Sequence, residues 1–178
     1  MSNVFRFQSD IELQAGSPQG KPQRVRILAY SGGTMRVSGW GAVAIDLAGL
    51  ETPARLPILV DHDATTGGVA GSGEPQSNGR ELTIAGSLAS TPAGEKVASL
   101  LRDGVPLQAS VGVEPTTTQR LRAGEKISVN GREIEAGNEG LTLVKAGRLR
   151  EVSVLPVGAD ANTQVSLAAR KSDMDQDK

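Results

Sequence analysis

The sequence predicts a mostly β domain with a few helices, an α+β fold in which short strands form a small closed or nearly closed β-barrel. Short apolar runs alternate with polar residues along most of the chain, and only one segment has helical spacing. Glycine is frequent, with 22 in 178 residues, and many of these glycines stand at turns between the runs. A barrel is the economical arrangement of many short strands, because closure leaves few unpaired edges.

Composition bounds the function as well as the fold. Hydrophobic residues make up 38% of the chain, which is enough for a core, and aromatic residues make up only 2%, so the core must consist of Val, Leu, Ile and Ala. The net charge of −1 and the scarcity of aromatic side chains argue against a nucleic-acid partner. Cysteine is absent, which excludes disulfides, thiolate nucleophiles and cysteine-based zinc sites.

We expect neither a signal peptide nor a membrane-spanning segment. The N-terminus lacks the basic region and apolar run of a signal peptide, and no apolar run approaches the roughly 20 residues that cross a bilayer. We therefore expect a soluble intracellular protein with no membrane partner. Residues 1–23 are expected to form an N-terminal arm, residues 24–167 the folded domain, and residues 168–178 a disordered tail.

Alternating or continuous apolar runs place the strands. In chain order they are expected at 24–30, 34–46, 56–60, 69–72, 81–88, 107–113, 126–135 (an Asn-Gly hairpin), 141–144 and 149–155, with a short edge piece at 164–167. The run 56–60 is continuously apolar, which is typical of a strand in the interior of a sheet. Residues 115–125 are rich in Thr and Arg and are expected to form a mobile loop.

One helix is predicted between Thr91 and Gly104. Thr91 is a suitable N-cap, Pro92 occupies the first helical position, where its missing N–H costs nothing, and Gly104 is placed as a C-terminal cap. An apolar stripe at helical spacing supports the assignment: Ala93, Val97, Leu100 and Leu101.

His62 is the only histidine, and it follows directly on the 56–60 strand. Its side chain is the one whose unperturbed pKa lies near neutrality, so it is the natural carrier of acid–base chemistry here. The alternative is a surface histidine that forms ordinary hydrogen bonds. Asp61 and Asp63 flank it, but a metal needs three or more converging ligands, and the chain has no second histidine. We expect neither a metal site nor a cofactor.

Ser110 is the candidate nucleophile. In an extended 107–113 segment it shares a polar face with Gly112, and small residues on that face leave room for a substrate backbone. The nucleophile-elbow signature G-x-S-x-G is absent, so an α/β-hydrolase site is not implied. A structural serine is the alternative.

Glu151 is the candidate acid. It lies on the face of the 149–155 strand that points away from the core, and it can orient His62 if that face lines the same cleft. The alternative is a solvated surface charge. Asp61, Asp63 and Glu114 compete for the same role.

The order of these blocks resembles that of a known family. An apolar run ending in His-Asp (56–63) precedes a Gly-rich hairpin (67–88), the helix Thr91 to Gly104, a Gln-Ala-Ser-Val-Gly-Val block (108–113), and a Glu-Val-Ser strand with an Ala-Asn turn (149–162). This ordered set is similar to the prohead proteases of tailed bacteriophages, the serine proteases of capsid maturation.

The resemblance covers roughly residues 25–167 and implies a fold related to the herpesvirus assemblins, a β-barrel flanked by helices. It implies a serine endopeptidase (a hydrolase) that cleaves itself and the N-terminal segments of scaffold or major capsid protein inside the prohead. Its location would be the host cytoplasm, inside the immature phage capsid. Cleavage specificity, and whether the chain acts as a monomer, a homodimer or a higher assembly, stay open.

The resemblance also implies roles for three residues. Ser110 is the nucleophile, His62 the general base, and Glu151 our choice for the third member. The herpesvirus enzymes have a second histidine in that third place, whereas this chain has none.

The oxyanion donors are less well defined by the resemblance. The herpesvirus enzymes have an arginine pair downstream, but residues 156–169 contain no arginine. The substitutes are the backbone N–H groups of Val111 and Gly112, or the side chains of Arg148 and Arg150.

Two other functions compete with the protease. One is a catalytically idle structural or scaffold-binding module of the capsid, in which Ser110 does not react with a serine-directed probe. The other is an unrelated β-barrel binding domain, in which His62 is structural and does not meet Ser110 and Glu151 in space.

Overall fold

The structure is a computed structural model, and it describes residues 5–11, 23–157 and 165–166. Most of the predicted arm 1–23 and the whole predicted tail 168–178 lie outside the described residues. The described strands are β1 (Phe5–Ile11), β2 (Gln23–Tyr30), β3 (Met35–Val37), β4 (Gly41–Ile45), β5 (Leu50–Glu51), β6 (Leu56–Val60), β7 (Val69–Ser77), β8 (Leu82–Leu88), β9 (Leu107–Leu121), β10 (Lys126–Val129), β11 (Arg132–Glu135), β12 (Leu141–Leu155) and β13 (Val165–Ser166). The helices are α1 (Pro92–Arg102) and two short 3₁₀ turns, η1 (Leu47–Gly49) and η2 (Thr66–Gly68).

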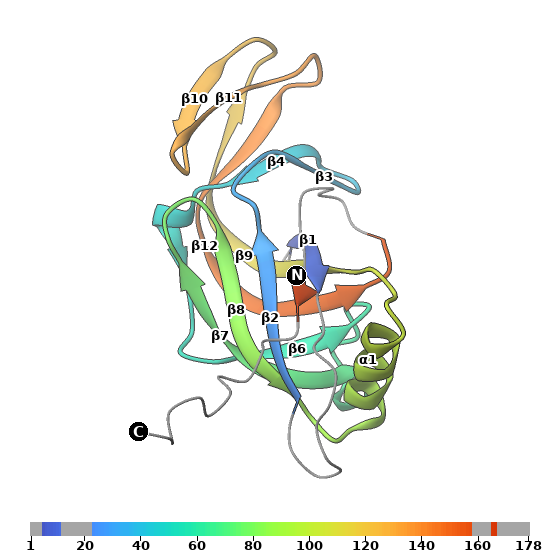
Figure 1. Cartoon of the computed structure of the whole chain (residues 1–178). Coiled ribbons are helices and arrows are strands. Elements are labelled where there is room, and N and C mark those ends of the chain that lie inside the picture. The colour runs from blue at the N-terminus through green and yellow to red at the C-terminus, as the bar shows by residue number, and fades with distance from the viewer. Residues whose placement is uncertain (1–4, 12–22, 158–164, 167–178) are drawn as a thin grey trace, which may run out of the picture.

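One mixed sheet contains all the described strands except β10 and β11. Nine of its strands follow in the order β3-β4-β12-β6-β7-β8-β2-β1-β9. β12 is the hub: β4, β5 and β6 pair with it in turn, all parallel, and β9 pairs with it antiparallel along most of its length. Figure 1 shows β9 and β12 as the two long ribbons that run through the molecule.

The predicted small closed or nearly closed barrel flanked by helices is wrong. The strands form a mixed sheet that branches at β12 and begins at β3, and α1 is the only α-helix in the part of the chain that the structure describes. The reason lies in strand length and direction. β9 and β12 have 15 residues each, because the expected loop at 115–125 largely belongs to β9 and the segments 141–144 and 149–155 form one strand. Because β12 is long, the short strands β4, β5 and β6 can pair with it one after another, all parallel to it.

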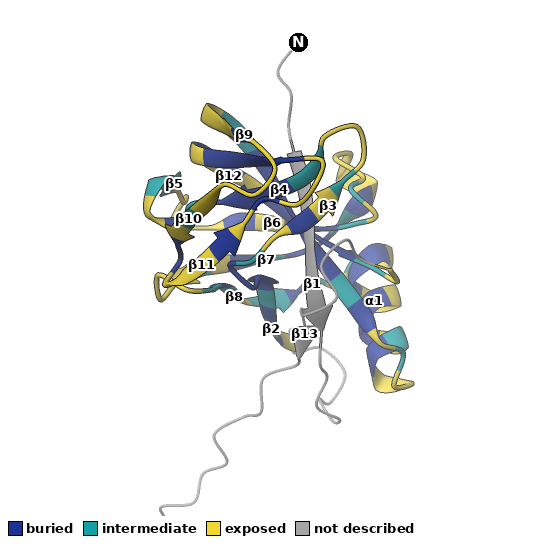
Figure 2. Cartoon of the chain, turned by 90° about the horizontal axis from the view of Figure 1, so that it is seen from above, coloured by how far each residue is buried: buried dark blue, intermediate teal, exposed yellow. Residues whose placement is uncertain are grey.

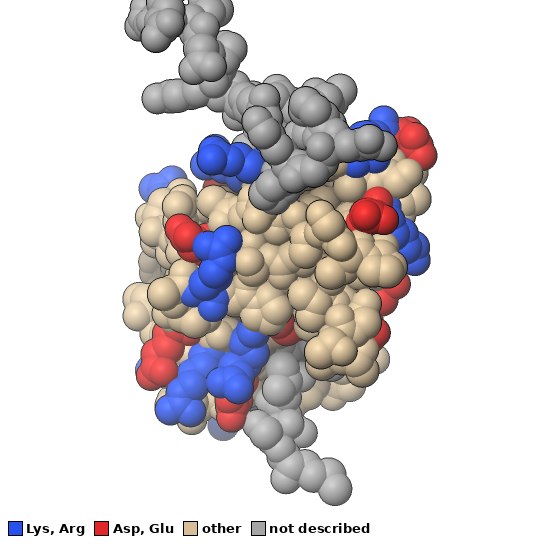
Figure 3. Space-filling view, turned by 90° about the horizontal axis from the view of Figure 1, so that it is seen from below, with Lys and Arg blue, Asp and Glu red and all other residues tan. Residues whose placement is uncertain are grey.

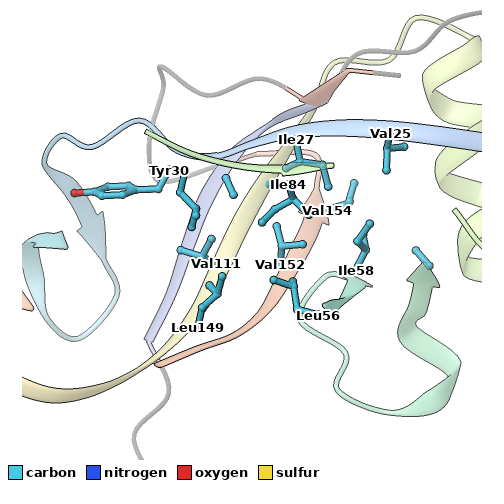
Figure 4. Close-up of a cluster of buried hydrophobic side chains, with 14 of the residues drawn as sticks. Val25, Ile27, Tyr30, Leu56, Ile58, Ile84, Val111, Leu149, Val152 and Val154 are labelled. Atoms are coloured by element: carbon cyan, nitrogen blue, oxygen red, sulfur yellow. The ribbon is translucent and has the colours of Figure 1, made fainter. Parts of the chain in front are cut away.

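The main hydrophobic core lies on one face of this sheet. Figure 4 shows side chains from β2, β6, β8, β9 and β12 pointing into a common space, among them Ile27, Ile58, Val111 and Val152, which are all 0% exposed. Burying each such aliphatic side chain contributes about 1.5–3 kcal/mol. As the composition predicts, this cluster consists of Val, Leu, Ile and Ala, with Tyr30 and Met35 as its two exceptions.

The predicted helix is present as α1. The Thr91 hydroxyl accepts a hydrogen bond from the Gly94 N–H at 3.1 Å, Pro92 opens the helix, and Gly104 follows its end with a φ of 74°. Its buried residues are Ala93, Gly94, Val97, Ala98 and Leu101, and they join the main core. Figure 2 shows α1 at one side of the sheet, with exposed residues on its outer surface.

The β10–β11 hairpin projects from one end of the molecule over a second, smaller hydrophobic cluster (Figure 1). As predicted, Asn130 and Gly131 form its turn, with φ values of 52° and 69°. The Asn130 side chain is buried and ties this turn to the main sheet: its amide donates to the carbonyls of Gly32 and Ile45 and its oxygen accepts from the Leu47 N–H.

In Figure 3, acidic and basic groups are intermixed around a mostly uncharged area of that face. Exposed ion pairs such as Arg55 with Glu74 and Lys126 with Glu133 fit this mixed pattern, and such pairs contribute little to stability. Among the described residues, no helix is both long and apolar enough to span a membrane.

Candidate active site

His62 stands in a tight turn at the end of β6. Asp61 and His62 have φ values of 51° and 59°, in the left-handed region that non-glycine residues rarely occupy. Two hydrogen bonds hold the turn: the Asp61 N–H donates to the Val154 carbonyl at 3.1 Å, and the Asp63 N–H donates to the Val60 carbonyl at 2.9 Å. Such backbone strain is often found at functional sites, and here it brings the histidine beside β12.

Asp63 stabilises the same turn from its other side. Its carboxylate accepts a hydrogen bond from the Thr65 N–H at 2.9 Å. Hydrogen bonds from the side chain and backbone of Thr65 lower the pKa of Asp63 below its ordinary value of 3.8. The Asp63 carboxylate thus shapes the loop through Thr65, so one competitor for the acid role is engaged elsewhere.

The imidazole of His62 meets the carboxylate of Glu151. Nδ1 lies 3.0 Å from Oε1, and the two side chains are only 16% and 12% exposed. When Nδ1 carries its proton it donates to the carboxylate, and Nε2 is then the nitrogen that can accept a proton. The structure therefore brings together two residues that lie 89 positions apart in the chain.

The Glu151 carboxylate is held on both oxygens. Oε1 faces His62, and Oε2 accepts a hydrogen bond from the hydroxyl of Ser153 at 2.6 Å, a length typical of an O–H donor to a charged oxygen. Ser153 is 0% exposed. The carboxylate also packs over Gly112, where an added Cβ would lie 2.4 Å from Oε1. A side chain at position 112 would therefore displace the acid.

A β-bulge aims Glu151 away from the core. The register of β12 against β9 shifts between Leu149 and Glu151, so Arg150 is an extra residue there. Leu149 belongs to the hydrophobic core, and strict alternation would place Glu151 on the core side as well. The bulge turns Glu151 outward and is of a kind often found next to active sites.

Ser110 lies on the same outward side of the sheet. It is paired with Ser153 across β9 and β12, and opposite residues in antiparallel strands have Cα atoms about 4.5–5.5 Å apart. Its side-chain oxygen is buried and has no hydrogen-bond partner among the described residues, and Ser110 as a whole is 1% exposed. The structure thus places Ser110 next to the Glu151–Ser153 pair, but without a hydrogen bond to His62.

The remaining predicted residues take different positions. The Arg150 Nε lies 4.0 Å from the Glu114 carboxylate, and the Arg148 Nε lies 3.1 Å from the Glu51 carboxylate. Glu114, the other competing acid on β9, therefore faces an arginine.

Val111 and Gly112 were predicted as oxyanion donors. Both lie where β9 is paired on both flanks, with β1 and with β12, so their N–H groups lie within the sheet. Arg150 is the predicted oxyanion residue that reaches the pocket described next.

A pocket of about 370 Å³ opens beside His62 and Glu151, within the size range of ligand sites. It lies between β6, the loop after His62 and the start of β7. Its lining residues are Pro57, Leu59, His62, Ala64, Thr65, Thr66, Val69, Arg150 and Glu151.

Sequence reasoning assigned no role to Ser153. The signal was available: residues two apart in a strand share a face, and a serine beside a carboxylate is a hydrogen-bond donor.

No family model, curated protein or solved structure matches this chain in comparisons with known proteins. The function is therefore argued from the site itself.

Proposed function

We propose that the protein is a serine endopeptidase in which Ser110 is the nucleophile, His62 the general base and Glu151 the acid that orients the base. The observation that supports this most directly is the 3.0 Å contact between His62 Nδ1 and Glu151 Oε1. It joins the only histidine of the chain to the acid chosen from four candidates, on the outward side of the sheet where the buried Ser110 also lies.

In this mechanism Nε2 of His62 removes the hydroxyl proton of Ser110 as the oxygen attacks the scissile carbonyl. Glu151 holds the imidazole in the tautomer with its proton on Nδ1 and stabilises the imidazolium that forms. The imidazolium then protonates the leaving amine, and water hydrolyses the acyl-enzyme by the same route. Arg150, whose side chain is 60% exposed, stabilises the negative oxygen from the pocket side.

The missing hydrogen bond between Ser110 and His62 has a physical explanation. Catalytic hydrogen bonds are often long in enzymes without substrate and shorten in the complex. The partner of Nδ1 is already in place, so the change that substrate binding must bring about is one that exposes the buried Ser110 oxygen and brings it to Nε2. The left-handed turn at 61–62 is the segment that would move.

The biological setting follows from the resemblance to prohead proteases. We propose scaffold protein or major capsid protein as the substrate, self-cleavage as a second activity, and the immature phage capsid in the host cytoplasm as the location. Enclosure in a shell raises the effective concentration of protease and substrate, so modest intrinsic activity would suffice.

Co-expression with the scaffold and capsid proteins of the same virus tests the proposal. Mass spectrometry should show shortened capsid or scaffold chains with the native protein and intact chains with Ser110→Ala. Ser128→Ala, at an exposed position in β10, is the matched control and should process normally. Processing by a folded Ser110→Ala variant would refute the assignment.

A catalytically idle capsid module is the second candidate. It is favoured by one observation: the Ser110 oxygen is buried and has no hydrogen-bond partner among the described residues. In that case a serine-directed fluorophosphonate would leave Ser110 unlabelled, while the protein would still bind scaffold.

A further inference from the structure

We infer that the pocket beside His62 holds an aliphatic side chain of the substrate, that of the residue next to the scissile bond. This inference rests on the proposed protease function and adds a substrate class to it. The pocket shares two walls with the site, since both His62 and Glu151 line it. A side chain in the pocket therefore brings its own main chain beside the imidazole.

The floor of the pocket is aliphatic. Pro57 and Leu59 alternate along β6 with the core residues Leu56 and Ile58, so they face the outer side. Leu59 is 5% exposed yet belongs to neither hydrophobic core cluster, which places its buried side chain beneath the pocket. Val69, paired with Leu59 at the start of β7, extends the same surface.

The polar groups of the pocket are mostly engaged elsewhere. The Glu151 carboxylate contacts His62 and Ser153, and the Arg150 guanidinium has the Glu114 carboxylate 4.0 Å away. The charged side chains, Arg150 and Glu151, belong to β12, whereas the floor residues Pro57, Leu59 and Val69 carry no charge. A leucine-like side chain is therefore the occupant that gains most from entering, because binding removes its apolar surface from water.

Peptidyl diphenyl phosphonates that differ only in the side chain next to phosphorus test this directly. The Ser110 oxygen forms a bond to phosphorus, the bond to one phenoxide breaks, and the serine proton passes through His62 to the leaving phenol. We compare a hydrogen, an isobutyl group and a carboxyethyl group at that position, and measure labelling rates by intact mass.

The isobutyl probe should label Ser110 at least about tenfold faster than the hydrogen probe, because even one methylene in a fitted apolar pocket is worth that much. Val69→Phe fills the pocket, so it should reduce the ratio of the isobutyl rate to the hydrogen rate at least about fivefold, most of the gain expected from one methylene group. Ala64→Trp, at an exposed lining position, is the second filling variant if Val69→Phe does not fold. Gln76→Phe, an exposed residue of β7 outside the pocket, is the matched control and should leave the ratio unchanged.

Three results would overturn the inference. Equal rates for the isobutyl and hydrogen probes, or an unchanged ratio in the filling variants, would place the side chain elsewhere while leaving the protease function intact. Fastest labelling by the carboxyethyl probe would show that Arg150 selects an acidic side chain instead. Labelling of Ser110 by none of the probes would remove the proposed function itself, and this inference with it.

Discussion

Replacing Ser153 with alanine tests the mechanism at a residue that does not touch substrate. The Ser153 hydroxyl donates to Glu151 Oε2 at 2.6 Å and is fully buried, so no water can replace it readily. Its loss leaves the carboxylate held only by His62 on Oε1. Ser153 is thus a positioning residue, and its removal should let Glu151 rotate away from the orientation that supports the imidazole.

The size of the effect follows from the bond that is lost. Hydrogen bonds to charged groups are worth about 1.5–3 kcal/mol. If this hydrogen bond no longer stabilises the catalytic orientation of Glu151, kcat falls by about 10- to 150-fold, because about 1.4 kcal/mol corresponds to a factor of ten in rate. The same loss of stability lowers the melting temperature by about 3–12 °C for a chain of this size.

Steady-state kinetics on a peptide substrate separates positioning from a general loss of structure. Ser153 does not line the pocket, so KM should stay within about twofold while kcat falls, which is the pattern of an interaction used in the transition state. Ser72→Ala is the matched control, because the Ser72 hydroxyl only accepts an exposed hydrogen bond from Arg55, and it should change stability by less than about 0.5 kcal/mol. A Ser153→Ala enzyme with an unchanged kcat, or one altered only in KM, would refute the reasoning.

Three further changes have defined outcomes. Gly112→Ala places a Cβ 2.4 Å from Glu151 Oε1, so activity in a peptide assay should fall about as far as in a Glu151→Gln variant. Full activity of Gly112→Ala would show that the close approach of Glu151 to position 112 does not matter for catalysis. Asp63→Asn removes a carboxylate whose pKa is lowered by hydrogen bonds from Thr65. This acid stabilises the fold above its ordinary pKa of 3.8 and loses that effect as the pH falls below it, so in urea titrations the variant should lose less stability than the native protein between neutral pH and pH 3. Asn130→Ala removes three buried hydrogen bonds, so the free energy of unfolding measured by urea denaturation should fall by about 2–4 kcal/mol. A fall of less than about 1 kcal/mol would show that other contacts hold the hairpin to the main sheet.

Local signals in the sequence were sufficient for the helix and for the position of most strands. Thr91, Pro92 and Gly104 mark the ends of α1 by hydrogen-bond and dihedral requirements that depend only on neighbouring residues. Strand pairing depends on residues far apart in the chain. The parallel pairing of β4, β5 and β6 with β12 had no local signal, and that is why the barrel prediction failed.

The same contrast applies to the site. His62 could be chosen because it is the only histidine, and the outward direction of Glu151 follows from Val152 and Val154, which face the core. The bulge at Arg150 and the left-handed turn at His62 are what join the two residues. Both are irregularities that periodicity cannot reveal, since each breaks the pattern on which the prediction rests.

The most direct test of the joint action of Ser110, His62 and Glu151 is the rate at which a small fluorophosphonate modifies the protein, followed by intact mass. The native protein should gain a single adduct that maps to Ser110, and His62→Ala should slow its formation by about 10²- to 10⁴-fold, the usual contribution of a general base. An adduct that forms equally fast without His62, or one that maps to a different serine, would contradict the account.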